Sequence, residues 1–157
     1  MHKITPFIMF NNQTEEAVNL YVSLFKNSKI VSMNKVSEGG PGQVGPVMTA
    51  TFVLEGQEFM AFDGGSYFTF SEGISLYVNC ETQAEVDELW EKLSAGGEKG
   101  QCGWLKDKFG VSWQIIPTAL GRLLGDKDPK KAHNVMQAML QMKKIDIAEL
   151  ERAYESK

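Results

Sequence analysis

The sequence has few residues that bind metals or form disulfides: two cysteines, Cys80 and Cys102, and two histidines, His2 and His133. The two thiols could pair with each other. The N-terminus, MHKITPFIMF, has no long apolar stretch and no small-residue cleavage site, so it does not resemble a signal peptide. We therefore expect a cytoplasmic protein with reduced thiols.

Long hydrophobic runs and clusters of positive charge are also missing. No apolar stretch reaches the ~18 residues that a membrane-spanning helix needs. The formal net charge is −4, and the 16 Lys and Arg residues are scattered along the chain. No basic stripe of the kind that binds a phosphate backbone is present. We therefore expect neither a membrane nor a nucleic acid as a partner.

Apolar residues, in contrast, are plentiful. They make up 43% of the 157 residues, and aromatic residues make up 10%. This composition supports a packed core in one ordinary domain, or in two small repeats that share a core.

The first half of the chain predicts one helix among four strands. We expect strands at residues 4–10, 29–37, 47–54 and 57–63, with a helix at 15–25 for which Thr14 could be the cap. The Glu55-Gly56 step indicates a hairpin. Residues 38–46 have the composition of a loop.

The pattern then repeats. A strand at residues 74–78 is followed by a helix, for which Thr82 and Glu85 fit a capping box. The apolar stripe of this helix lies 69 positions after that of the first: Ala17, Leu20, Tyr21 and Leu24 correspond to Val86, Leu89, Trp90 and Leu93. Strands near 98–101, 103–106 and 111–116 follow. A repeated strand-helix-three-strand unit predicts an α+β fold of two βαβββ modules, at residues 1–66 and 67–117.

The remaining residues, 118–157, predict a helical tail. Asp128 before Pro129 indicates an N-cap followed by proline at the first helical position. Asp146 with Glu149 is a carboxylate version of the capping box for a last helix.

The stretch WLKDKFGVSWQIIP, residues 104–117, predicts two strands joined by a turn at 107–110, which Asp107 shapes. Alternation in the second strand separates Ser112, Gln114 and Ile116 from Val111, Trp113 and Ile115. The second set is more apolar and should meet a helix. The first set carries an amide and should face a cleft.

The duplicated module resembles the vicinal oxygen chelate superfamily, which includes glyoxalase I, extradiol dioxygenases and the fosfomycin and bleomycin resistance proteins. GWLKDKFGVSWQ and KIDIAELERAY point more narrowly to the PhnB-like branch, labelled 3-demethylubiquinone-9 3-methyltransferase-like. The resemblance implies a single domain with the glyoxalase/bleomycin resistance/dioxygenase fold, sheets that curl into a cleft, and a homodimer. The residues do not support the methyltransferase label, because the only glycine-rich run, residues 39–45, lies between two predicted strands.

Enzymes of this superfamily hold a divalent metal with four side chains from the first and fourth strands of each module. The resemblance implies Thr5, Met60, Gly73 and Gln114 at those positions. The first three are poor or impossible ligands for a hard or borderline cation, so we predict neither metal nor cofactor.

The predicted wall of the cleft is apolar and aromatic with a few polar groups, which is typical of a small-molecule pocket. It could equally be a filled sheet interior that binds nothing. Its proposed ligand-binding members are Thr5, Phe7, Met60, Phe62, Ser75, Tyr77 and Gln114, with Met9, Glu58, Ser112 and Ile116 beside them.

Three functions remain open at this stage. The first is a metal-free binding protein for a small apolar or aromatic molecule. The second is an enzyme with an atypical site, of lyase, dioxygenase or transferase type, for which Glu58 and Tyr77 are the weak catalytic candidates. The third is a structural dimer without a ligand. The sequence does not decide whether the protein is an enzyme.

Overall fold

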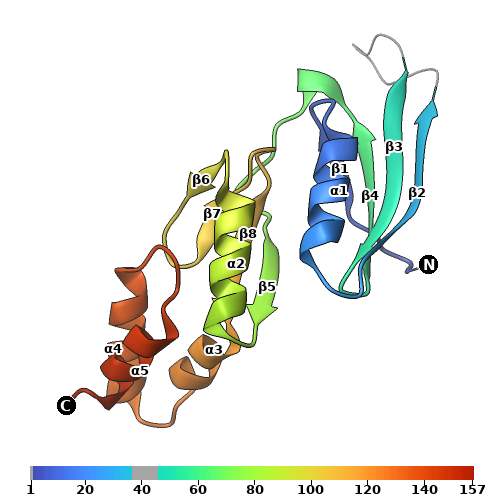
Figure 1. Cartoon of the computed structure of the whole chain (residues 1–157). Coiled ribbons are helices and arrows are strands. Elements are labelled where there is room, and N and C mark those ends of the chain that lie inside the picture. Colours follow the sequence, from blue (N-terminus) through green and yellow to red (C-terminus); the bar gives the residue numbers. More distant parts are fainter. Residues whose placement is uncertain (1, 37–45) are drawn as a thin grey trace. The chain divides into compact units, whose positions relative to one another are not determined.

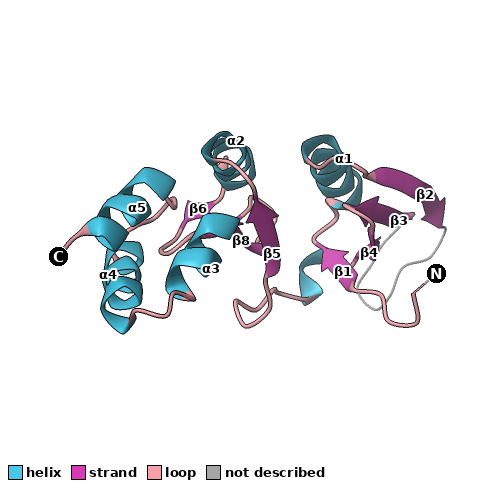
Figure 2. Cartoon of the chain, turned by 90° about the horizontal axis from the view of Figure 1, so that it is seen from below, coloured by secondary structure: helices cyan, strands magenta, loops and turns pink. Residues whose placement is uncertain are grey.

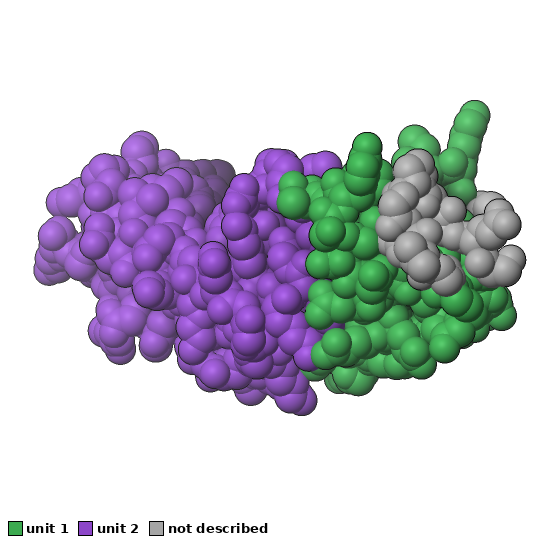
Figure 3. Space-filling model, turned by 90° about the horizontal axis from the view of Figure 1, so that it is seen from above, with its two compact units in different colours: residues 1–69 green, residues 70–157 purple. Residues whose placement is uncertain are grey.

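The computed structural model describes residues 2–36 and 46–157. The chain divides into two compact units, residues 1–69 and 70–157, which Figure 3 colours separately. The predicted loop at 38–46 lies almost wholly outside the described residues.

Unit 1 is a βαβββ module (Figure 1). It runs β1 (Phe7–Phe10), α1 (Thr14–Leu24), β2 (Lys29–Val36), β3 (Val47–Leu54) and β4 (Gln57–Asp63), followed by a 3₁₀ turn, Gly65–Tyr67. The sheet order is β1-β4-β3-β2, with β1 parallel to β4 and the other pairs antiparallel. The hairpin between β3 and β4 turns at Glu55 and Gly56, both with positive φ, as a type I′ turn requires. This confirms the predicted hairpin.

Helix α1 covers one face of this sheet, and its buried residues meet alternate strand residues. The core on that face is formed by Phe10, Ala17, Val18, Tyr21, Ala50, Phe52, Phe59 and Ala61. The opposite face carries the other half of each alternating strand.

The start of α1 is fixed from outside the helix. Thr14 is the first helical residue rather than the cap, and its backbone N–H donates to Asp63 Oδ1 at 3.1 Å. The other carboxylate oxygen, Oδ2, accepts from the N–H of Met48 at 2.8 Å. The prediction that Thr14 caps the helix was therefore wrong, because a carboxylate at the end of β4 takes that role.

Unit 2 repeats the module and adds the tail. Its elements are β5 (Leu76–Cys80), α2 (Gln83–Ser94), β6 (Glu98–Lys99), β7 (Trp104–Lys106) and β8 (Ser112–Pro117), followed by α3 (Thr118–Leu124), α4 (Pro129–Leu140) and α5 (Ile147–Glu155). The order β5-β8-β7-β6, with β5 parallel to β8, matches unit 1. Two βαβββ modules with C-terminal helices are thus confirmed.

Strand β5 begins two residues later than predicted. The N–H of Ile74 bonds to the carbonyl of Ser71, and that of Gly73 bonds to Ser71 Oγ, so the chain is still turning there. Ile74 is consequently exposed instead of belonging to the strand.

The predicted caps of unit 2 are present. Thr82 Oγ1 accepts from the N–H of Glu85, and the Glu85 carboxylate accepts from the N–H of Glu81, one residue before the cap. Asp128 and Asp146 cap α4 and α5. Side-chain acceptors at these positions satisfy donors that the first helical turn leaves unpaired.

The three tail helices, which Figure 2 shows beside the sheet of unit 2, enclose a core of their own. Its buried members are Ile116, Leu120, Leu123, Val135, Ile145 and Leu150. Ile116 therefore packs under the tail and does not belong to an open cleft wall, which corrects its predicted position. Gln83 joins α2 to the tail, since its side chain donates to the carbonyl of Ile145 and accepts from the N–H of Ile147.

In the part of the chain that the structure describes, no helix is long and apolar enough to cross a membrane.

Candidate functional site

Strand β8 has two chemically different faces. Trp113 is 2% exposed and, with the buried Ile115, lies on the side of the sheet that α2 covers. Its indole Nε1–H donates to Asp107 Oδ2 at 2.9 Å. Gln114 points to the opposite side and is half-buried. The predicted alternation is confirmed for these residues, and it leaves an amide on the face away from α2.

Gln114 lies between two aromatic residues. Its cross-strand partners are Tyr77 on β5 and Trp104 on β7, so all three share one face. Tyr77 is 56% exposed, and Trp104 is half-buried. The sequence left the orientation of Trp104 open, and the register with Gln114 now fixes it.

Only the nitrogen of the Gln114 side-chain amide has a hydrogen-bond partner among the described residues. Its Nε2 donates to Ser75 Oγ at 2.9 Å. No described residue donates to its Oε1, which is left as an acceptor on the open face. We name this group the amide row: Ser75, Tyr77, Trp104 and Gln114.

The corresponding face of unit 1 is more apolar. Phe7, 52% exposed, is paired directly with Met60, and the next β1 residue on that face, Met9, is paired with Phe62. Thr5 precedes β1, and its hydroxyl donates to a Glu58 carboxylate oxygen at 3.5 Å. The four predicted ligand-binding residues of this unit therefore lie together on the face away from α1.

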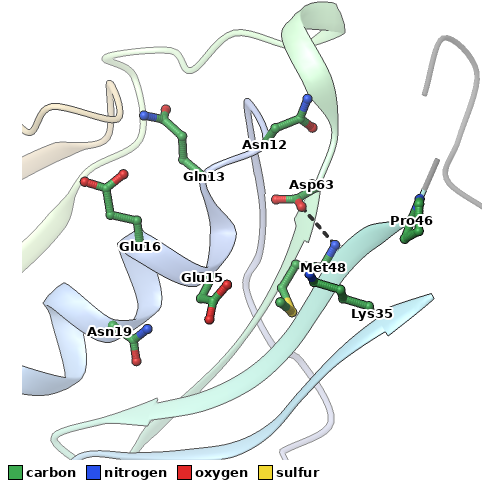
Figure 4. A pocket seen from close by; sticks show the side chains of 9 residues that line it. All are labelled: Asn12, Gln13, Glu15, Glu16, Asn19, Lys35, Pro46, Met48 and Asp63. Atoms are coloured by element: carbon green, nitrogen blue, oxygen red, sulfur yellow. Dashed lines mark hydrogen bonds between the residues drawn. The ribbon is translucent and has the colours of Figure 1, made fainter. Parts of the chain in front are cut away.

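One described pocket lies elsewhere. A pocket of about 460 Å³ in unit 1 is lined by Asn12, Gln13, Glu15, Glu16, Asn19, Lys35, Pro46, Met48 and Asp63 (Figure 4). It contains none of the predicted site residues. Figure 4 shows that the Asp63 carboxylate accepts a hydrogen bond from the backbone N–H of Met48. This pocket is polar and belongs to the start of α1, and sequence reasoning did not find it.

Comparison with known proteins decides the family. The family model described as 3-demethylubiquinone-9 3-methyltransferase matches residues 2–116. A solved structure described as a putative 3-demethylubiquinone-9 3-methyltransferase, PhnB protein, from Bacillus cereus is 46% identical, with a TM-score of 0.67, covering 74% of this chain and 100% of its own. The chain belongs to this PhnB-like family.

Two further structures extend the comparison. Protein PA1353 from Pseudomonas aeruginosa shares the fold at 21% identity, with a TM-score of 0.58, covering 74% of this chain and 98% of its own. The fosfomycin resistance protein FosX from Listeria monocytogenes, complexed with Mn(II) and sulfate, is 17% identical with a TM-score of 0.46, over 72% of this chain and 87% of its own. No curated protein is detectably similar to the chain.

The four positions at which the resemblance predicted metal ligands carry few donors in this PhnB-like chain. Met60 lies opposite Phe7, Gln114 lies opposite Tyr77, and Gly73 belongs to a turn. Across residues 2–36 and 46–157, no three His, Cys, Asp or Glu side chains are grouped so that they could hold a metal ion. Our expectation of a site without metal or cofactor stays a prediction.

Neither cysteine of this family member forms a disulfide. Burial raises the pKa of the Cys80 thiol to about 12, with the carboxylates of Glu85 and Glu81 adding to the effect. A thiol with this pKa is protonated at neutral pH and is a poor nucleophile. Cys102 is half-buried on a segment that bonds to the tail, since its N–H donates to the carbonyl of Met142.

Proposed function

We propose that this PhnB-like protein binds a small aromatic molecule that carries a hydrogen-bonding group, without a metal ion. The observation that supports this most is the amide row. Gln114 offers an amide oxygen to which no described residue donates, between Tyr77 and Trp104 on the face away from α2. A few placed polar groups among aromatic side chains are the usual composition of a small-molecule site.

The spacing of the row suits a flat ligand. Strands β5 and β7 flank β8, so Tyr77 and Trp104 are separated by two strand spacings, roughly 9–10 Å. One planar ring fits in that width, with an edge over the Gln114 amide. A hydroxyl or N–H on the ring would donate to Gln114 Oε1.

We propose that the face of unit 1 away from α1 also makes apolar contacts with small aromatic molecules. Phe7 and Met60 are exposed there, with Phe62 and Thr5 beside them. Exposed aromatic side chains on a sheet face favour a binding role over a purely structural one, because an apolar side chain that stays in water adds no hydrophobic stabilisation to the fold.

The activity in the family name is not part of this proposal. A nucleotide-like cofactor such as S-adenosylmethionine is usually held at a glycine-rich turn between a strand and a helix. The connection from β1 to α1 is Asn11–Gln13 and that from β5 to α2 is Glu81-Thr82, and neither contains glycine. A binding function needs no such turn.

Replacing Gln114 by Leu should weaken binding of phenol about tenfold, since a hydrogen bond in a partly dry site is worth roughly 1–2 kcal/mol. The fold should be unchanged, because Gln114 lies outside the core. Nuclear magnetic resonance titration with phenol, and with toluene as the ligand without a hydroxyl, measures both affinities at the Trp104 indole signal. The variant should lose the preference for phenol.

Asn79→Leu is the matched control. Asn79 is an exposed amide on the same face of β5, one row away and paired with Ile116. It should leave phenol binding unchanged. Phenol binding equally strong in Gln114→Leu and in the unchanged protein would contradict the proposal.

We also propose that the protein is a cytoplasmic homodimer. The two unpaired thiols favour a reducing compartment. Strand β2 is an exposed edge of its sheet, and α4 turns Met136 and Leu140 outward although its other side is buried. Sedimentation at micromolar concentration should give twice the chain mass of 17.5 kDa. A clean monomer would refute the dimer without affecting the binding site.

A further inference from the structure

A lysine lies next to the amide row on the same face. Lys106 is two residues after Trp104 on β7 and is paired with Ser112, which is two residues before Gln114 on β8. The alternation of a strand therefore turns Lys106 to the side that carries Trp104 and Gln114. Its neighbour on β6 is Glu98, directly opposite in the register.

The ammonium group of Lys106 is occupied by a carboxylate from outside the sheet. Its Nζ donates to Glu72 Oε1. Glu72 belongs to the loop before β5, and Phe70 in the same loop lies against the turn at Gly110. The pairing lowers the pKa of Glu72 and raises that of Lys106, so both groups are charged at neutral pH.

The ion pair is exposed and therefore easily exchanged. The Lys106 side chain is 36% exposed and that of Glu72 is 65% exposed. Pairs in such surroundings add little to stability, because water and salt screen them. Because the pair contributes little to stability, Glu72 is not needed to hold the fold. The Lys106 ammonium can therefore exchange the carboxylate of Glu72 for that of a ligand.

We propose that the ligand of the amide row carries a carboxylate that replaces Glu72 at Lys106. This rests on the proposed binding function and narrows its ligand to small aromatic carboxylates. Lys106 and Gln114 are diagonal cross-strand neighbours, whose separation is about 7–8 Å. A ring with a donor at one end and a carboxylate at the other spans this distance, and the pair with Glu72 shows that the Lys106 ammonium can donate to a carboxylate oxygen.

The test compares two probes that differ only in charge: 4-hydroxyphenylacetate and its neutral amide, 4-hydroxyphenylacetamide. Titration of the full chain is followed at the Gln114 side-chain amide and the Trp104 indole. The carboxylate should bind more tightly than the amide, and high salt should reduce the difference. Glu72→Gln should tighten binding of the carboxylate by roughly two- to fivefold, since the internal competitor is removed.

Two further variants complete the test. Lys106→Met should remove the preference for the carboxylate over the amide. Glu98→Gln, which changes the other carboxylate beside Lys106 without freeing its Nζ, should have a smaller effect than Glu72→Gln.

The outcomes separate this inference from the function on which it rests. Equal binding of both probes at Gln114, unaffected by Glu72→Gln, would overturn the carboxylate ligand and leave the binding function standing. Failure of both probes to move the Gln114 and Trp104 signals would overturn both.

Discussion

Replacing Trp113 by Ala should lower the free energy of unfolding by about 3–5 kcal/mol, through the cavity that the lost indole leaves. Trp113 is among the largest fully buried side chains, and α2 packs against its strand, β8. The substitution also removes the indole hydrogen bond to Asp107 Oδ2. Chemical denaturation followed by circular dichroism measures the change.

Trp113→Phe separates packing from hydrogen bonding. The phenyl ring fills most of the space, so its cost should be mainly that of losing the hydrogen bond from the indole to Asp107, about 1–3 kcal/mol. If the alanine variant lost no more stability than an exposed substitution such as Asn79→Leu, the assignment of Trp113 to the core would be wrong.

Replacing Asp107 by Ala should cost a similar amount, roughly 3–5 kcal/mol, for a different reason. Asp107 is 2% exposed, and its carboxylate accepts hydrogen bonds from the N–H groups of Phe109 and Val111 at 2.9 and 3.0 Å, and from the Trp113 indole at 2.9 Å. Alanine leaves all three donors without this acceptor in a buried turn.

Asp107→Asn gives a sharper form of the experiment. It keeps one oxygen for the turn but can present an NH₂ group to the indole N–H, so two donors meet. In the Trp113→Phe background the indole donor is absent, and Asp107→Asn should cost less there than in the unchanged protein. Additive effects in this double-mutant cycle would contradict a direct bond between the two side chains.

Much of the fold could be predicted because its signals are local. The 69-residue offset between the two helical stripes marks the repeat, and alternation in residues 111–116 separates Trp113 from Gln114. Thr82, Asp128 and Asp146 precede helices in patterns that satisfy the first turn. Each of these inferences requires only residues that are neighbours along the chain.

The parts that could not be predicted depend on distant residues. Asp63 bonds to the start of α1 from the end of β4, 49 positions away. The pair of Lys106 and Glu72 spans 34 positions. Ile116 has the alternation of an open-face residue, but the tail that follows it folds back and buries it. No local pattern contains this information, because it arises only when the sheets and the tail pack.

In the candidate site, too, some residues could be predicted from local sequence and others required the packed strands. Gln114 and Tyr77 were found from their strands, and register now adds Trp104, whose short strand gave no clear alternation. The family assignment establishes the architecture of these strands but not their ligand. The functional proposal therefore depends on the amide row itself.

The most direct test of the account is one paired measurement on Gln114→Leu and Trp113→Ala, adjacent residues on opposite faces of β8. Thermal unfolding and phenol titration are recorded for each. The account predicts that Gln114→Leu keeps its unfolding temperature and binds phenol about tenfold more weakly, whereas Trp113→Ala loses stability. If Gln114→Leu unfolds while Trp113→Ala stays folded and loses binding, the two faces are reversed and the proposed site is wrong.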